Sequence, residues 1–207
     1  MLCELHPTNK IKYMGMKKSN IILSGVGGQG ILTIAGIIGM ATLKEKLYFK
    51  QSEVHGMSQR GGAVQSNFRI SDTPVASDLV PLGQADLILS VEPLETLRYL
   101  PFLNKNGWLV CNSSPFINVP DYPELEKILN TIAEWPNHLI IDADKIAKDL
   151  GNRRGSNMVI LGAASQYICL DFESLESGIS AIFERKGDAV VQQNLLALRA
   201  GRDAALK

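Results

Sequence analysis

The sequence has few cysteines, and those it has are not clustered. Cys3, Cys111 and Cys169 stand far apart, with no Cys-x-x-Cys spacing anywhere in the 207 residues. Iron–sulfur clusters and zinc sites in proteins are held by closely spaced cysteine or histidine ligands. We therefore expect no metal on this chain, and any redox centre that it serves has to lie in another polypeptide.

The sequence also lacks an excess of charge and a long apolar run. Lysine plus arginine number 21 and aspartate plus glutamate number 21, so no overall field attracts nucleic acid or an anionic membrane. No apolar run approaches about 18 residues, and no charged-then-apolar secretory leader is present. Unpaired cysteines are typical of a reducing compartment. We expect a cytoplasmic protein with neither a nucleic-acid nor a membrane partner.

Apolar patterning predicts strands that alternate with helices. The nearly continuous apolar runs are typical of central parallel strands that are covered on both faces. The alternation predicts an α/β fold, a Rossmann-like, doubly wound and mostly parallel sheet with helices on both faces. We expect residues 1–18 to form a flexible leader and 19–207 a single domain. The predicted strands are 21–23, 46–51, 63–70, 86–91, 108–111 and 138–141, and the predicted helices are 31–38, 93–103, 122–135, 156–170, 175–186 and 188–205.

A glycine cluster joins the first predicted strand to the first predicted helix. Gly25, Gly27, Gly28 and Gly30 surround Gln29 in this tight turn. Glycine accepts positive φ and lets a ligand approach the main chain, and the first amides of a helix are free donors with partial positive charge. The turn therefore suits a phosphate. Close packing of the strand on the helix is the alternative use of such glycines.

Residues 52–62, Ser-Glu-Val-His-Gly-Met-Ser-Gln-Arg-Gly-Gly, follow neither a strand nor a helix period. We predict a site loop that joins two strands. His55 could relay protons near neutral pH, and Arg60 could hold a carboxylate or phosphate through a bidentate fork. A structured loop with internal salt bridges is the alternative. In a nicotinamide site an acidic residue ends the second strand, and Glu53 falls near that position but inside the loop.

Two further segments have a structural and a functional interpretation. Glu92 and Glu95 flank Pro93 at a predicted helix start, where carboxylates cap free amides; a site role for Glu92 stays open. The segment 157–164 is a helix whose small residues allow close packing. Its first residue, Asn157, could alternatively face a cleft.

Together, segments 25–30, 52–62, 92–95 and 157–164 resemble the gamma-type subunit of the 2-oxoacid:ferredoxin oxidoreductases, most closely the branch that uses indolepyruvate. The similarity covers about residues 19–205. It implies that 19–207 is the catalytic domain of that subunit type. It also implies oxidative decarboxylation of an aryl-2-oxoacid, with coenzyme A as acyl acceptor and ferredoxin as electron acceptor. Thiamine diphosphate and the iron–sulfur clusters would lie on a larger partner subunit, without which this chain is inactive.

The resemblance also implies roles for individual residues. The amides of the glycine turn and the side chain of Gln29 would meet a phosphate of coenzyme A. Glu53, His55 and Arg60 would support catalysis at the edge of the partner's active site. The complete set expected to bind the co-substrate or cofactors is Gly25, Gly27, Gly28, Gln29, Gly30, Ser58, Gln59, Gly61, Gly62 and Asn157.

Other functions remain open at this stage. The chain could serve a pyruvate or branched-chain 2-oxoacid oxidoreductase of the same group. It could be a free-standing dinucleotide-dependent oxidoreductase with Glu53 on the ribose. It could also be a scaffold whose glycine-rich surface only docks a partner. We expect the isolated chain to self-associate through the apolar surface that its partner would cover.

Overall fold

The computed structural model describes residues 17–55, 61–117 and 119–207. They form a six-stranded sheet of order β2-β3-β1-β4-β5-β6. Strands β1, β4, β5 and β6 are parallel, and β3 lies between β1 and β2, antiparallel to both. Three of the five pairings are therefore parallel, and the predicted α/β class is confirmed. The elements follow the order β1 (Lys18–Val26), α1 (Ile31–Lys44), β2 (Tyr48–His55), β3 (Ala63–Ser71), β4 (Ala85–Ser90), α2 (Pro93–Arg98), β5 (Leu103–Asn112), α3 (Leu125–Ala133), β6 (His138–Ile141), α4 (Ala143–Asp149), α5 (Ser156–Ala164), α6 (Phe172–Phe183) and α7 (Asp188–Ala205).

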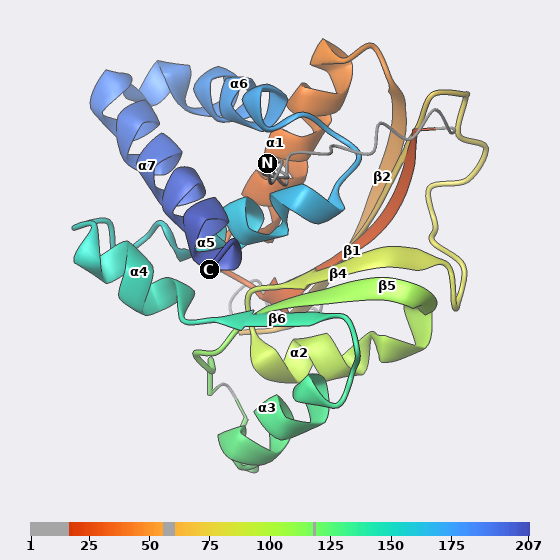
Figure 1. The fold of residues 1–207 in the computed structure, drawn as a ribbon, viewed down its shortest axis with the longest axis vertical. Coiled ribbons are helices and arrows are strands. Elements are labelled where there is room, and N and C mark those ends of the chain that lie inside the picture. Colours follow the sequence, from red (N-terminus) through yellow and green to blue (C-terminus); the bar gives the residue numbers. More distant parts are fainter. Residues whose placement is uncertain (1–16, 56–60, 118) are drawn as a thin grey trace, which may run out of the picture.

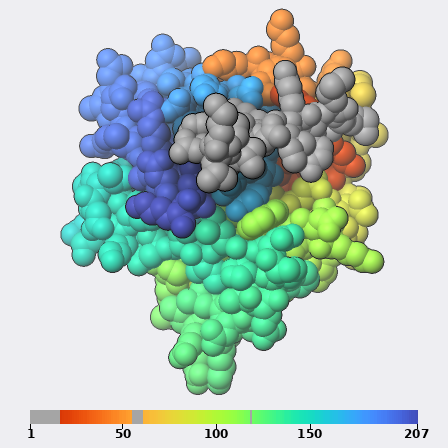
Figure 2. All heavy atoms as spheres, viewed as in Figure 1, coloured from red at the N-terminus to blue at the C-terminus, as the bar shows by residue number. Residues whose placement is uncertain are grey.

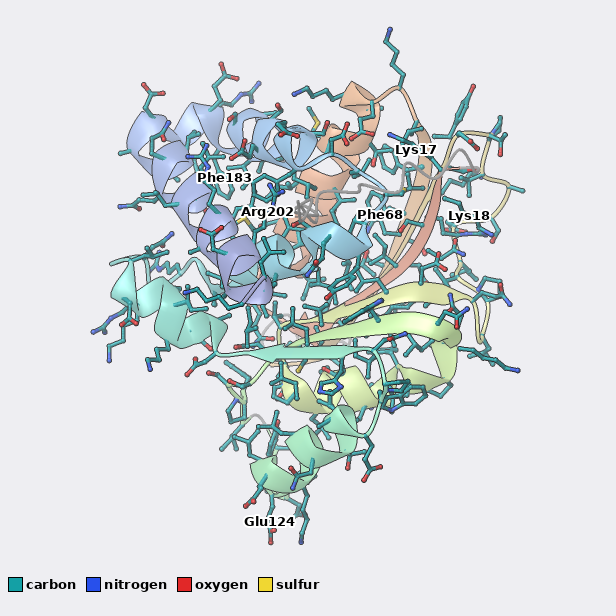
Figure 3. The ribbon with its side chains drawn as sticks, viewed as in Figure 1. Lys17, Lys18, Phe68, Glu124, Phe183 and Arg202 are labelled. Carbon is teal, nitrogen blue, oxygen red and sulfur yellow. The ribbon has the colours of Figure 1, made fainter. Side chains whose placement is uncertain are left out.

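Helices cover both faces of the sheet (Figure 1). Helices α1, α5, α6 and α7 lie over one face, where Leu23, Phe68 and Leu89 enter the larger core. Helices α2 and α3 lie over the other face and pack on Ile22, Ile88 and neighbouring residues. Phe68, labelled in Figure 3, points from β3 toward the larger helical layer and stacks on Phe49 at a centroid distance of 5.2 Å. Helices therefore cover both faces of the sheet, as predicted.

The chain leaves two neighbouring parallel strands toward opposite faces. After β1 it turns into α1 on the larger helical layer, and after β4 it turns into α2 on the smaller one. In open α/β sheets such a divergence creates a crevice outside the carboxyl ends of the strands. The glycine turn lies at the β1 side of this crevice.

The hairpin β2–β3 corrects one expectation. Residues 52–55, predicted as the start of a site loop, continue strand β2 in register with β3, with Ser52 opposite Asn67 and His55 opposite Val64. The apolar alternation was hidden because β2 is an edge strand, so polar side chains are tolerated on it and even Val54 is exposed. Residues 56–60 lie outside the described part of the chain.

Several helix boundaries also differ from the expected ones. Helix α2 ends at Arg98 because Pro101 follows, and Leu103 already begins β5. Helix α5 ends at Ala164 and is followed by a 3₁₀ turn, Ser165–Tyr167. The short helix α4 was not predicted.

Other predicted bounds shift as well, most of all for α1, which continues six residues beyond its predicted end to Lys44, and for β5, which begins five residues before its predicted start at Leu103. Helix α3 is shorter at both ends than predicted, and α6 starts three residues earlier, at Phe172. Strand β6 and helix α7 have the predicted bounds. In the space-filling view, the segment around α3 projects below the rest of the molecule (Figure 2), with Glu124 at its far end in Figure 3.

The described chain includes residues 17 and 18, the last two of the predicted flexible leader, and both have a fixed place in the fold. Lys17 already has fixed partners: its ammonium group donates to Glu45 Oε2 at 2.8 Å, which raises the pKa of Lys17. Lys18 is the first residue of β1. Residues 1–16 lie outside the described part of the chain, so the expectation of a flexible leader stays a prediction for them.

Candidate functional site

A cavity of about 400 Å³ opens at the carboxyl ends of β1, β4 and β5. It lies at the crevice that the sheet topology creates, where ligands of open α/β sheets bind. Its walls come from four parts of the chain: the glycine turn after β1, Val91 after β4, the segment after β5, and the segment that connects α4 to α5. Among the lining residues are Gly28, Gln29, Asn112, Ser114, Arg153 and Arg154.

The glycine turn presents its backbone to this cavity. Gly28 has φ +103° and Gly30 has φ +82°, conformations that L side chains rarely adopt. A Cβ added at Gly28 would meet no atom within 4 Å, so the main chain is open to a ligand there. Gln29 fixes the shape of the turn, since its Oε1 accepts a 2.7 Å hydrogen bond from the amide of Val26. Gly25 has a packing role, because a Cβ there would lie 2.5 Å from Val91 Cγ2, and its predicted part in binding stays a prediction.

The two glycine clusters of the sequence lie together. The amide of Gly27 donates to the carbonyl of Gly62 at 2.8 Å, and the amide of Gly61 donates to the carbonyl of Gly27 at 3.4 Å. The end of the segment 52–62 is thereby attached to the turn after β1, as expected if both border one site.

Asn157 packs against the glycine turn at Gly30. It is the second residue of α5, and its side-chain amide donates to the carbonyl of Gly30 at 3.4 Å. A Cβ at Gly30 would collide with that amide and would also be strained at φ +82°, so a glycine suits both the turn and its contact with Asn157. The structure thus shows that Asn157 packs on the turn, and its role in binding a ligand stays a prediction.

The structure does not bring Glu53 to the cavity. Glu53 lies on β2 and lines a separate groove of about 360 Å³ between this strand and α1, together with Leu32 and Phe49. Strand β3 separates β2 from β1, unlike the second strand of a nicotinamide-binding unit. For His55 only the place of its backbone in β2 is described, and Ser58, Gln59 and Arg60 lie outside the described residues.

The floor of the cavity is a hydrogen-bonded polar pair. The side-chain amide of the buried Asn112 donates to Asp144 Oδ2 at 2.9 Å. The Oδ1 atom of Asn112 accepts from the backbone amide of Ala143 at 3.0 Å. These contacts join the end of β5 to the start of α4. They also engage the Asp144 carboxylate, which lines the cavity.

Arg153 and Arg154 are site residues that the sequence analysis missed. Both line the cavity directly before α5, whose N-cap residue Gly155 makes no side-chain capping bond. The sequence Arg-Arg-Gly at a helix start could have indicated an anion site, because free amides and cations together favour an anion. It was overlooked because α4 was not predicted, which left the segment without an assigned position.

Glu92 has the structural role that its position indicated. One carboxylate oxygen caps α2 by accepting from the amide of Glu95 at 2.9 Å. The other accepts from the amide of Phe116 at 3.3 Å and from the hydroxyl of Tyr122, which holds the loop after β5 against the cavity. Burial and the contact with Glu92 raise the pKa of Tyr122, so its hydroxyl remains a donor.

The cysteines within the described ranges are poorly suited to bind metal. Cys111 is buried, and burial raises its pKa to about 12; Cys169 is half-buried, with its pKa raised by burial to about 11. Metals bind the thiolate form. In residues 17–55, 61–117 and 119–207 no three histidine, cysteine or acidic side chains form a metal-binding group. None of the helices in these ranges has the length and apolar character that crossing a bilayer requires.

Curated proteins with related sequences match most of this chain. It is 37% identical over 194 residues to the indolepyruvate oxidoreductase subunit IorB of Archaeoglobus fulgidus, covering 90% of this chain and 95% of that one. Identity to the IorB subunit of Pyrococcus horikoshii is 43% over 159 residues, covering 73% and 78% of the two chains.

A solved structure shares the fold, and a sequence family matches most of the chain. The 2-oxoglutarate:ferredoxin oxidoreductase of Magnetococcus marinus, solved with 2-oxoglutarate, coenzyme A and succinyl-CoA bound, has the same fold, with a TM-score of 0.72 at 22% identity. That match covers 92% of this chain and 31% of the larger one. The pyruvate ferredoxin/flavodoxin oxidoreductase family matches residues 20–204. The chain therefore belongs to the pyruvate ferredoxin/flavodoxin oxidoreductase family.

Proposed function

We propose that this chain is the cluster-free subunit of an indolepyruvate:ferredoxin oxidoreductase. In partnership with a larger subunit it would oxidatively decarboxylate an aryl-2-oxoacid to the aryl-acetyl-CoA and pass the electrons to ferredoxin. The observation that carries this proposal is the identity of 37–43% to curated indolepyruvate oxidoreductase subunits along most of their length.

The glycine turn is the part of this chain that meets coenzyme A. The open backbone at Gly28 and the uncapped start of α1 favour a phosphate at this place. Gln29, fixed by its bond to Val26, holds the turn in the shape that presents these amides. The chain thus binds and orients the acyl acceptor, and the bond-making steps take place on the partner.

Thiamine diphosphate and the iron–sulfur clusters belong on the larger subunit. The cysteines in the described ranges do not fit a cluster, because Cys111 and Cys169 are separate and protonated at neutral pH. We assign no cluster ligand to this chain. The segment 55–62 would border the partner's active site, with His55 and Arg60 positioning the carboxylate or the acyl acceptor.

The free-standing dinucleotide enzyme is the weaker alternative. It requires Glu53 beside the glycine turn, whereas Glu53 lies in a different groove with β3 between its strand and β1. The scaffold alternative is tested together with the main proposal.

The test is to co-express the full chain with the larger subunit and purify the complex without oxygen. The complex should reduce ferredoxin with indolepyruvate in a reaction that requires coenzyme A, and much more slowly with pyruvate or a branched-chain 2-oxoacid. Omission of this chain should abolish the activity. A preference for pyruvate would move the substrate assignment to that branch. Full activity of the larger subunit alone would refute the catalytic role and favour a scaffold.

A further inference from the structure

The two arginines in the cavity have no partner among the described residues. Within 17–55, 61–117 and 119–207, neither Arg153 nor Arg154 forms a hydrogen bond or an ion pair. Both arginines are exposed. Arg98 and Arg199, by contrast, are engaged: Arg98 pairs with Glu95 at 2.9 Å, and Arg199 with Glu176 at 2.6 Å. Two adjacent cations that line a cavity with a single acidic residue, Asp144, leave an excess of positive charge that suits an anionic ligand.

The surroundings of the pair add to its positive potential. Helices α1 and α5 both begin beside the cavity after a glycine N-cap, which has no side chain to occupy the first amides, although the amide of Met158 in α5 donates to Asn157 Oδ1. Helix starts carry partial positive charge. The acidic side chain of the lining is Asp144, whose carboxylate already accepts from Asn112. The cavity therefore has two ends that favour an anion: the backbone amides of the glycine turn and the charged arginine pair.

We propose that these two ends bind two different phosphate groups of one ligand. This inference rests on the proposed function, in which the ligand is coenzyme A: the glycine turn takes the diphosphate, and Arg153 and Arg154 take the 3′-phosphate of the ribose. A phosphate monoester carries nearly two charges at neutral pH and three acceptor oxygens, which two guanidinium groups match. An aryl-2-oxoacid has one carboxylate and could not engage both ends.

The cavity wall also favours a nucleotide over a simple anion. Phe116 lines the cavity, the residue is 43% exposed, and its backbone amide donates to Glu92. An aromatic ring beside two phosphate sites offers a stacking surface for a base. The adenine of coenzyme A would lie against it.

The experiment compares coenzyme A with 3′-dephospho-coenzyme A, which differ only in the proposed ligand of the arginines. Dissociation constants are measured by calorimetry on the complex with the larger subunit, for the wild type and for the double variant Arg153→Gln/Arg154→Gln. The wild type should bind coenzyme A about tenfold to a hundredfold more tightly than the dephospho form, as expected for charged hydrogen bonds. The double variant should lose this preference and bind the dephospho form as the wild type does.

The matched control is Lys145→Gln/Lys148→Gln, which removes the same charge from exposed positions on nearby α4. It should leave the preference for coenzyme A intact. An equal loss for both ligands in the arginine variant would overturn the assignment to the 3′-phosphate. Unchanged binding of both would overturn the arginine subsite while leaving the proposed function standing. Absence of coenzyme A binding by the wild-type complex would instead refute the proposed function itself.

Discussion

The glycine turn after β1 and the crossing of α5 with α7 use the same residue type for opposite purposes. At Gly28 an added Cβ would meet nothing within 4 Å, whereas at Gly162 it would lie on the carbonyl oxygen of Leu198, and at Gly201 on that of Val159. The first glycine is needed for its backbone conformation, with φ +103°, and for access from solvent. The other two allow two helices to touch backbone to backbone. The comparison shows that one part of the molecule is kept open for a ligand and another is closed completely.

The largest effect on stability should come from adding an atom where two helices already touch. Gly162→Ala forces α5 away from α7, and we expect the free energy of unfolding to fall by about 3 kcal/mol, the upper part of the range for overpacking. Denaturant unfolding monitored by circular dichroism measures it. Gly36→Ala in α1 is the matched control, because its new Cβ would meet only the flexible end of Ile182 at 3.3 Å. Equal losses in the two variants would remove the distinction between packed and open glycines.

Glu92 joins the packed region to the cavity wall. Glu92→Ala removes the cap of α2 and leaves the amide of Phe116 and the hydroxyl of Tyr122 without their acceptor. We expect a loss of about 2 kcal/mol in the free energy of unfolding. The loop after β5 should also become sensitive to proteolysis in the native state. Glu126→Ala, an exposed position in α3, should change neither quantity. Unaltered proteolysis would show that Glu92 serves α2 alone.

Gly28→Ala separates backbone strain from ligand access. Strain at positive φ should cost about 1 kcal/mol of unfolding free energy, and coenzyme A should bind at least about tenfold more weakly to the complex. Gly83→Ala is the matched control, since Gly83 has φ +68°, equally open surroundings and a position away from the cavity. It should show the same loss of stability with unchanged coenzyme A binding. A similar loss of binding in both variants would mean that strain alone explains the effect.

The smallest effect is expected for the chemical reactivity of Cys111, which lies in the core next to the cavity. Cys111 is fully buried beside Asn112, which lines the cavity, and burial raises the pKa of Cys111 to about 12. Because alkylation needs the thiolate, we expect iodoacetamide at pH 8 to leave Cys111 unmodified in the native protein, as measured by peptide mass spectrometry. The unfolded protein should react readily. Rapid native labelling would show that the core beside the cavity opens to solvent.

A helix or strand could be predicted from the sequence where its own residues show a clear apolar pattern. Strand β6 and helix α7 agree with their predicted bounds because their apolar patterns end at clear breaks. The prediction ended β2 four residues too early. Strand β2 lies at a sheet edge, where polar and exposed side chains conceal the apolar alternation. Helix α4 was missed because seven residues give only two turns of periodicity.

The sequence by itself determined the α/β class, the glycine turn and the motifs that identify the family, because these depend on local backbone preferences and short spacings. Only the tertiary structure decided which of those residues share a site. It joined Gly27 to Gly61 and Gly62, turned Asn157 toward Gly30, and separated Glu53 from the turn by inserting β3 between the two strands. It also brought Arg153 and Arg154 to the cavity, about 125 residues after the turn that they face. Contacts at such separation follow from strand order and the crossing of helices, and no local pattern encodes either.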